Sequence, residues 1–466
     1  MRKWSRRQVA RNAAAAGIVA PFAQGCATTA AAPGGPPNIL FIMADDLGYA
    51  DLSCYGRTDY STPVLDGLAA DGLQLTNGYA NSAVCAPTRV ALATGRYQYR
   101  LTIGLGEPGI RGDHGIPPEH PTLPSQLKRL GYRTALIGKW HIGSPPHFGP
   151  LRNGYDRFYG LYGGGTDYFR HAPDNALGEG AMRANATLID QDAPARDEGY
   201  LTDLFTDRAI QWIEGGGTEP YFLSLHFTAP HWPWEGPGDQ AVSQQLTDLN
   251  HQDGGSLKVY AEMVRSLDRN IGRVLEAIER GGARNNTIVV FTSDNGGERF
   301  SDVWPFVGVK GELLEGGIRV PAIVRWPGRI ARGQRCEQVI TSMDWMPTLL
   351  AAAGGAPDPA YPSDGANLIA ELTGAPAKPR KLFWRFKANE QRAFRDGDWK
   401  YLKIRGFEHL FNLAEDQRER ADRKDHEAAI FARMKAEYDA WDATMLAYTE
   451  EAYSHDVTKG NYSDRY

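Results

Sequence analysis

The chain has 466 residues, and 51 Lys and Arg residues against 56 Asp and Glu residues give it a formal net charge of −5. Hydrophobic residues make up 42% and charged residues 23% of the sequence, which is typical of a globular protein with a core and excludes a disordered or membrane-embedded chain. The slightly acidic balance favours no nucleic-acid partner, and the 4 cysteines have no zinc-ribbon or C-x-x-C spacing.

The first 37 residues have the layout of a targeting segment. A basic start precedes a small apolar run over 13–22 and a Pro/Gly-rich stretch, so we predict a signal peptide and spacer over 1–37. The apolar run is too short for a transmembrane span. Ser5-Arg6-Arg7 resembles the bacterial twin-arginine signal and predicts an exported periplasmic or cell-surface protein. Cys26 is either a lipid-anchor site or an incidental cysteine beside a plain cleavage site.

From Asn38 onward, short apolar runs alternate with helical patterns. The runs lie at 39–44, 134–138, 221–227, 287–291 and 320–326. Apolar residues at steps of three and four predict a helix from Leu257 to Gly281-Gly282, and weaker patterns predict helices over 201–214 and 346–353. This alternation predicts an α/β fold with a large mixed, mainly parallel sheet flanked by helices.

The pattern changes after Gly354. A Pro/Gly-rich passage over 355–362 precedes alternating runs near 393–395 and 399–404, which are typical of antiparallel strands, and a helical pattern over 427–446. We therefore expect a main domain over 38–365 and a smaller C-terminal α+β domain over 366–466, with an antiparallel sheet and a helix.

Polar residues follow four of the predicted strands. In chain order they are Asp45-Asp46, then Lys139-Trp140-His141, then His226 with Pro230-His231, and finally Asp294-Asn295. The carboxyl ends of parallel strands meet at one edge of a sheet, where such folds bind ligands. Carboxylate and amide oxygens suit Ca²⁺ or Mg²⁺. Each group alone is also compatible with a turn, a helix cap or a loop, but their joint placement favours a metal-dependent anion site.

A further segment, Val84 to Arg89, precedes a helix-compatible stretch over 90–93. Pro87 suits a first helical turn, so Cys85 should lie at the amino end of a helix, where anions bind and a thiol pKa is lowered. Arg89 lies one turn further on the same side. From its chemistry alone, Cys85 is either a thiolate nucleophile or a small buried hydrophobic residue.

Cys85-x-Pro87-x-Arg89, taken with the strand-end motifs in the same order, resembles the type I, formylglycine-dependent sulfatase family of the alkaline phosphatase superfamily. The resemblance runs almost end to end and includes 38–56, 153–168, 260–297, 310–317 and the strands around 396–400. It implies an alkaline-phosphatase-like fold and a sulfuric ester hydrolase.

The same resemblance implies a set of site residues. Cys85 would be converted to Cα-formylglycine by a separate maturation enzyme. One Ca²⁺ per chain would be held by Asp45, Asp46, Asp294, Asn295 and the modified Cys85. Arg89 and Lys139 would hold the formylglycine hydroxyls, Lys310 and His231 the sulfate and its leaving oxygen, and His141 would take the proton in the elimination step. The resemblance assigns no role to His226, for which a packed strand histidine or a substrate-pocket residue is the preferred interpretation.

The substrate is expected to be a sulfated small molecule or, as a hypothesis, a sulfated carbohydrate. Residues 232–235 (Trp-Pro-Trp-Glu) and 162–168 could stack on sugar rings near the sulfate pocket, or could simply pack loops together. Two alternatives remain at this point. One is a phosphate or phosphonate ester hydrolase of the same superfamily, and the other is a catalytically silent carbohydrate-binding surface protein.

Overall fold

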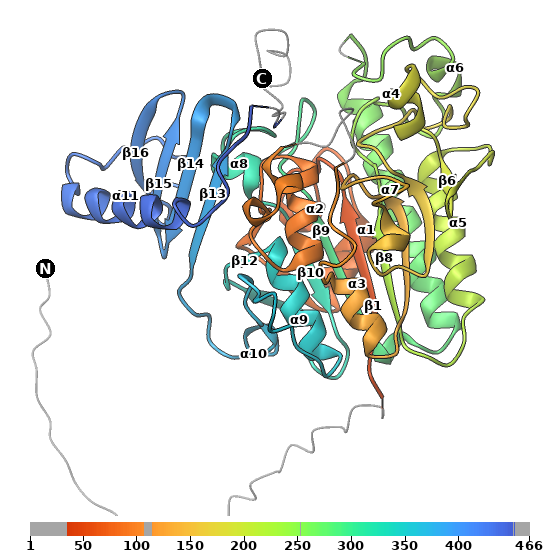
Figure 1. Cartoon of the computed structure of the whole chain (residues 1–466), viewed down its shortest axis with the longest axis horizontal. Helices are drawn as coiled ribbons and strands as arrows, with labels where there is room; N and C mark the ends of the chain where they lie inside the picture. The colour runs from red at the N-terminus through yellow and green to blue at the C-terminus, as the bar shows by residue number, and fades with distance from the viewer. Residues whose placement is uncertain (1–34, 107–113, 252, 451, 453–466) are drawn as a thin grey trace, which may run out of the picture. The chain divides into compact units, whose positions relative to one another are not determined.

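The computed structural model describes residues 35–106, 114–251, 253–450 and 452 (Figure 1). The predicted signal peptide, including Cys26, lies almost wholly outside these ranges, so the export signal and the lipid anchor stay predictions. No helix in the described ranges has the length and apolar character that a bilayer span requires.

The main sheet has ten strands. Their order is β11 (Gln334–Cys336), β2 (Leu73–Leu75), β10 (Ala322–Arg325), β9 (Thr287–Ser293), β1 (Asn38–Ala44), β8 (Tyr221–His226), β4 (Arg133–Lys139), β5 (Arg157–Leu161), β6 (Ile189–Asp190) and β7 (Ala193–Pro194). Strands β9, β1, β8, β4 and β5 are parallel neighbours, whereas β10 runs antiparallel to β9. The mixed, mainly parallel sheet is confirmed. A separate pair joins β3 (Gly78–Tyr79) to β12 (Ile340–Thr341).

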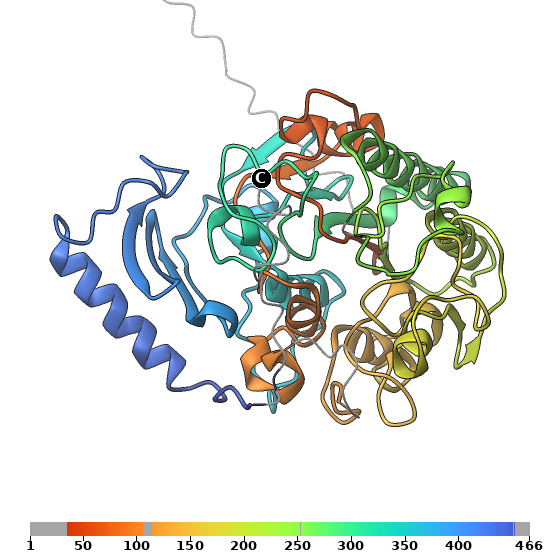
Figure 2. The same ribbon diagram turned by 90° about the horizontal axis from the view of Figure 1, so that it is seen from above.

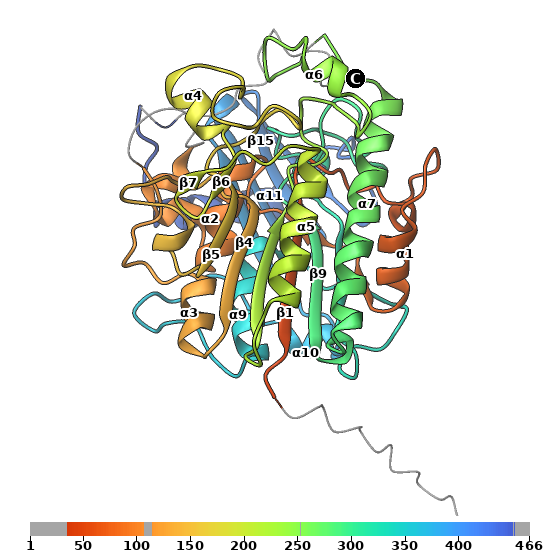
Figure 3. The ribbon, with the colours of Figure 1, turned by 90° about the vertical axis from the view of Figure 1, so that its right-hand side faces the viewer.

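Helices cover both faces of this sheet (Figures 1 and 3). One face carries α1 (Pro63–Ala70), α5 (Leu201–Glu214) and α7 (Leu257–Arg280), and the other carries α2 (Cys85–Thr94), α3 (Leu123–Arg129) and α9 (Trp345–Ala352). Shorter helices are α4 (Gly180–Asn185), α6 (Gln240–Ser243), α8 (Glu315–Ile318) and α10 (Ile369–Leu372). The predicted helices over 201–214 and 346–353 correspond to α5 and α9.

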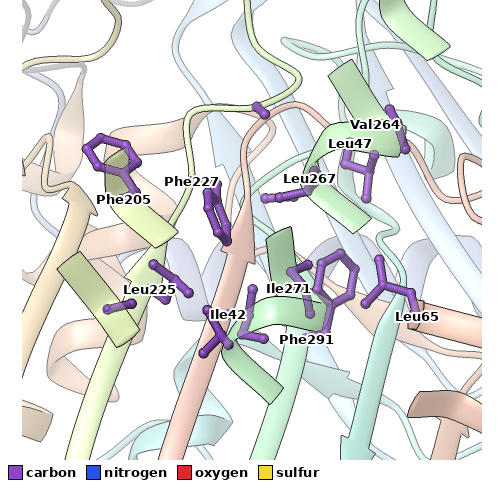
Figure 4. Close-up of a cluster of buried hydrophobic side chains, with 14 of the residues drawn as sticks. Ile42, Leu47, Leu65, Phe205, Leu225, Phe227, Val264, Leu267, Ile271 and Phe291 are labelled. Atoms are coloured by element: carbon purple, nitrogen blue, oxygen red, sulfur yellow. The ribbon is translucent and has the colours of Figure 1, made fainter. Parts of the chain in front are cut away.

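Strand β1 shows why both faces need a helical layer. Its residues point alternately to opposite sides, so Ile42 packs toward α7 while Phe41 packs in the cluster that includes α2 and α9. On the first side, Leu267 and Ile271 of α7 meet the sheet at the predicted helical spacing (Figure 4). The Ser256 hydroxyl caps the start of α7, and the helix ends before Gly281, as predicted.

The C-terminal sheet is antiparallel and contains β13 (Lys381–Phe386), β14 (Gln391–Asp396), β15 (Trp399–Ile404) and β16 (Phe407–Asn412). Helix α11 (Ala428–Asp442) covers one face through Met434 and Tyr438 (Figure 2). This helix ends four residues earlier than the predicted 427–446. The other face contacts the main sheet region, where Trp384 Nε1 donates to the Ala80 carbonyl at 2.8 Å. The domain boundaries at 365 and 366 stay predictions.

Candidate active site

Four adjacent parallel strands, β9, β1, β8 and β4, deliver polar residues to one edge of the sheet. Asp45 and Asp46 directly follow β1, Asp294 and Asn295 directly follow β9, and Lys139 is the last residue of β4. The backbone N–H of Asp46 donates to Oδ1 of Asp294 at 3.3 Å. All five side chains are buried. The structure therefore brings together the residues that the strand-end pattern predicted to converge.

Cys85 is the first residue of α2, as predicted, and its Sγ lies 3.6 Å from Oδ1 of Asp45. The expected lowering of its thiol pKa is wrong. Burial raises the pKa of Cys85 well above its usual value, and the opposing charges of Lys139 and Lys310 do not compensate. The unmodified side chain is therefore a neutral thiol near pH 7, which disfavours a thiolate nucleophile.

Each of the three carboxylates has a buried cationic partner. The nitrogen–oxygen distances are 2.5 Å for Lys139 and Asp45, 2.8 Å for Lys310 and Asp46, and 2.7 Å for Arg89 and Asp294. Arg89 donates from both Nε and Nη2 to one oxygen, Oδ2 of Asp294, and the two bonds restrain the guanidinium plane. Three carboxylates and three cations therefore alternate in the cluster, and their charges balance when all three carboxylates are ionised.

The two consecutive aspartates differ in acidity. Burial, together with the nearby charge of Asp294, raises the pKa of Asp45 to about 8 against the attraction of Lys139. Burial also acts to raise the pKa of Asp46, but the charges of Lys310 and His231 outweigh it and hold that pKa below its usual value. An additional cation beside Asp45 would therefore displace a proton at neutral pH.

The residues present fit a hard metal ion. Ligand atoms of Asp45, Asp46, Cys85 and His231 all lie within 4.8 Å of one another. Asn295 donates from Nδ2 to Asp46 Oδ1 at 2.6 Å, while its own Oδ1 is buried without a hydrogen-bond partner among the described residues. A buried oxygen in that state is costly unless it binds a cation or a water. The oxygen-rich set suits Ca²⁺.

Two predicted site histidines lie in the same neighbourhood. His141 and His231 are both buried, and burial holds the pKa of each well below its usual value, so both imidazoles are neutral. His231 Nδ1 lies 2.6 Å from the carbonyl oxygen of Trp232, so it must carry the hydrogen. His231 consequently presents Nε2 to the site, 3.6 Å from Oδ2 of Asp46.

The loops singled out as possible sugar contacts divide into two groups. Trp234 and Glu235 are buried, and Trp234 packs against the Arg299 guanidinium at 4.4 Å, so loop packing accounts for both. Trp232 is half-buried, with its ring centre 4.1 Å from that of His231. In the other loop, the Gly164 backbone lies so close to His141 that a Cβ there would be 2.6 Å from Cε1.

Sequence reasoning missed two contacts of this site. Glu298 lies 3.4 Å from the Lys310 ammonium group. Its position directly after the Asp294–Gly297 motif is the one feature of the sequence that indicates a place at this site. His226 lies with Nδ1 3.4 Å from Nη1 of Arg89, so it is more than a packed strand histidine. No local pattern could have paired residues 89 and 226.

A protein-family model described as Sulfatase matches residues 37–356 of the chain. The match covers the strands and loops that carry the cluster just described, and it spans more than half of the sequence. The chain therefore belongs to the sulfatase family, in the alkaline phosphatase superfamily. Members of this family are sulfuric ester hydrolases.

Individual relatives agree with this assignment. Arylsulfatase J of Mus musculus is 33% identical over 354 residues, which cover 74% of this chain and 57% of the relative. N-acetylgalactosamine-6-sulfatase of Homo sapiens is 32% identical over 377 residues, covering 75% and 68% respectively. The crystal structure of Ps i-CgsB is 30% identical, has a TM-score of 0.81 and covers 91% of this chain and 96% of that one. The same protein has been crystallised with k-i-k-neocarrahexaose.

Proposed function

We propose that this protein removes sulfate from a sulfated carbohydrate, using a formylglycine derived from Cys85 and one bound Ca²⁺. The observation that carries the proposal is the convergence of Cys85 at the start of α2 with three carboxylates and three cations, of which Asp45, Asp46, Asp294 and Lys139 lie at strand ends of the main sheet. Residues of these kinds, buried around one point, suit hydrolysis of an anionic ester.

The charge balance supports an anionic substrate. Asp45, Asp46 and Asp294 balance the three cationic side chains, so a divalent ion would leave the site with two net positive charges. A sulfate monoester carries one negative charge and develops more on its leaving oxygen. Calcium, when bound, offsets charge on the sulfuryl oxygens and lowers the pKa of a coordinated hydroxyl.

The residues around position 85 have separate roles in the proposal. Formylglycine supplies, as its hydrate, one hydroxyl to attack sulfur and a second whose deprotonation releases the sulfate. Arg89 and Lys139 orient those hydroxyls, and the neutral His141 accepts the proton in the release step. Lys310 and His231 both approach Oδ2 of Asp46 and would bind the sulfate and its leaving oxygen.

Two observations support a carbohydrate substrate. Half-buried Trp232 lies against His231, where an aromatic ring could stack on a sugar. A pocket of about 410 Å³ lies beside the Lys310 loop, and its walls include Glu298, Glu312 and Arg405, groups that accept or donate hydrogen bonds to hydroxyls. The relative named N-acetylgalactosamine-6-sulfatase and the neighbour crystallised with k-i-k-neocarrahexaose guide the choice of test compounds.

The proposal is tested first at Cys85. Peptide mass spectrometry of protein from a host that contains a formylglycine-generating enzyme should show the aldehyde at position 85, and Cys85→Ala should abolish sulfate release. Wild-type protein should hydrolyse p-nitrophenyl sulfate faster than p-nitrophenyl phosphate. The opposite order of rates would favour the phosphate or phosphonate ester hydrolase, and undiminished sulfate release by Cys85→Ala would remove Cys85 as the nucleophile precursor.

The substrate class needs its own comparison. N-acetylgalactosamine 6-sulfate and sulfated carrageenan oligosaccharides should be desulfated with a higher kcat/KM than p-nitrophenyl sulfate. Activity confined to the aryl ester would exclude the carbohydrate hypothesis. Saccharide binding without any sulfate release would instead identify the catalytically silent binding protein.

Export and maturation belong to the same proposal. We propose that a formylglycine-generating enzyme acts on Cys85 and that the twin-arginine-like segment directs the protein to the periplasm or cell surface, with Cys26 as a possible anchor site. Replacing Arg6 and Arg7 by Lys should retain the protein in the cytoplasmic fraction. An unchanged distribution would contradict twin-arginine export.

A further inference from the structure

His226, the last residue of β8, contacts the buried guanidinium of Arg89 on the side away from Asp294. Nη1 of Arg89 donates to the Lys139 carbonyl at 2.9 Å and approaches His226 Nδ1 at 3.4 Å. Nε and Nη2 of the same guanidinium bind Asp294. Because a guanidinium can only donate hydrogen bonds, a hydrogen bond at this contact requires Nδ1 of His226 to accept and its hydrogen to reside on Nε2.

The surroundings of His226 keep its imidazole neutral. Burial and then the charge of Arg89 hold its pKa well below the usual value, against a smaller opposing contribution from the Lys139 backbone. The Phe41 ring lies edge-on, with its centre 6.2 Å from that of the imidazole. A neutral acceptor can orient Arg89 without adding a negative charge that would compete with Asp294.

The imidazole also lines a small cavity of about 20 Å³, whose lining includes Arg89, Trp140 and Ser224. Nε2 of His226 and Nε1 of Trp140 are both buried without a hydrogen-bond partner among the described residues. A cavity of this volume has room for one water molecule. One water could accept from both nitrogens, which would favour the same tautomer.

We infer that His226 is a positioning residue, whose Nδ1 accepts from Nη1 of Arg89 and thereby fixes the guanidinium that binds Asp294. The catalytic consequence rests on the proposed function, in which Arg89 orients the hydroxyls at position 85. Without the imidazole, Nη1 keeps only the Lys139 carbonyl, so the guanidinium is held less firmly in the position that Asp294 sets. The effect should fall on kcat more than on KM, because Arg89 acts on the nucleophile.

Three substitutions of His226 distinguish the roles of its two ring nitrogens. In His226→Asn the amide can place its oxygen near the Nδ1 position, whereas His226→Gln places its amide near Nε2 and His226→Phe supplies neither. With p-nitrophenyl sulfate, the Asn variant should keep kcat within about threefold of wild type. The Gln and Phe variants should lose about 10- to 100-fold, as expected when a hydrogen bond to a charged group is removed.

A matched control and a measurement independent of activity complete the test. His171 is also buried, but it bonds to the Asp197 carbonyl outside this site, so the same three substitutions there should leave kcat unchanged. Thermal unfolding of every variant shows whether a loss of kcat follows a loss of Tm. Nitrogen-15 NMR of histidine-labelled wild type should show His226 with an unprotonated Nδ1 at pH 7.

Several results would overturn the inference. These are full activity in His226→Gln, equal losses in the Asn and Phe variants, losses of kcat that follow Tm alone, or a protonated Nδ1 in the NMR spectrum. Wild-type protein that releases no sulfate from any ester would refute the proposed function instead. The NMR result would then decide the contact between His226 and Arg89 by itself.

Discussion

The side-chain amide of Asn295 donates to Oδ1 of Asp46 at 2.6 Å, across 249 positions of sequence. This bond fixes the amide so that its own oxygen remains for a cation. The Asn295 side chain keeps this orientation because its Nδ2, and not its oxygen, faces the Asp46 carboxylate. An aspartate at position 295 would place a second carboxylate against the first one.

We therefore expect Asn295→Asp to lower the Tm of the calcium-free protein and to enlarge the rise in Tm when Ca²⁺ is added, because the ion relieves the new repulsion. Differential scanning fluorimetry with chelator and with excess Ca²⁺ measures both values. Asn250→Asp is the matched control, since Asn250 makes an exposed contact with Asp248. A calcium-induced shift equal to that of wild type would contradict the prediction.

Calcium affinity should depend on pH through Asp45. Its pKa of about 8 in the calcium-free protein means that the carboxyl holds a proton at neutral pH, and an incoming ion must displace that proton. Affinity should therefore rise with pH, by about tenfold per unit between pH 6 and 8, and level off above pH 8. Isothermal titration calorimetry at pH 6, 7 and 8 measures this slope. A pH-independent affinity would show that Asp45 is not titrated by the ion.

Gly164→Ala should impair catalysis with little effect on stability. The new Cβ would lie 2.6 Å from Cε1 and 2.7 Å from Nε2 of His141, so the imidazole must move. We expect kcat for p-nitrophenyl sulfate to fall by more than about tenfold, while Tm stays close to that of wild type. Gly165→Ala should have a smaller effect, since its Cβ would be 3.3 Å from His231 Cε1.

The control for these variants is Gly67→Ala. Gly67 lies inside α1, and its added Cβ would meet no heavy atom within 4 Å. That substitution should leave kcat unchanged and should raise the free energy of unfolding by about 0.5–1 kcal/mol, the usual difference between Ala and Gly in a helix. An unaltered kcat in Gly164→Ala would show that His141 does not depend on this contact.

A buried ionic group ties the C-terminal sheet to the segment that carries Lys310. The Lys400 ammonium of β15 lies 2.9 Å from Glu315 and 2.8 Å from Glu419, and all three side chains are fully buried. Lys400→Met would remove the buried cation beside Glu419 and leave Glu315 with only its second partner, Arg319, at 2.9 Å. We expect a loss of about 3–5 kcal/mol in the free energy of unfolding, measured with urea.

Lys403→Met tests whether that loss is specific to the buried group. Lys403 is on the same strand, but it pairs at 3.4 Å with an exposed glutamate, Glu390, and its removal should cost less than about 1 kcal/mol. Similar losses for the two lysines would mean that the buried carboxylates are protonated in the variant. Glu419 has a pKa of about 7 with Lys400 beside it, and removing that cation raises the pKa further, so the two variants should be compared at several pH values above 8.

Much of the fold followed from local patterns. The apolar runs that became β1, β4, β8 and β9 have no helical period, and the 3.6-residue spacing of α7 is unambiguous. The direction of β10 did not follow, because a short apolar run has the same pattern in a parallel and an antiparallel strand. The sequence also did not predict that α11 ends at Asp442, because local helix propensity defines the last residues of a helix poorly.

The sequence by itself determined that Asp45, Asp46, Lys139, Asp294 and Asn295 gather at the site, because they lie at or directly after strand ends and parallel strands end at one edge of their sheet. Only the tertiary structure decided how they meet. The contact of Lys310 with Asp46 joins positions 264 residues apart, and that of His226 with Arg89 joins positions 137 apart. Such contacts, and the raised pKa of Cys85, depend on how buried layers pack and exclude water, which no local pattern encodes.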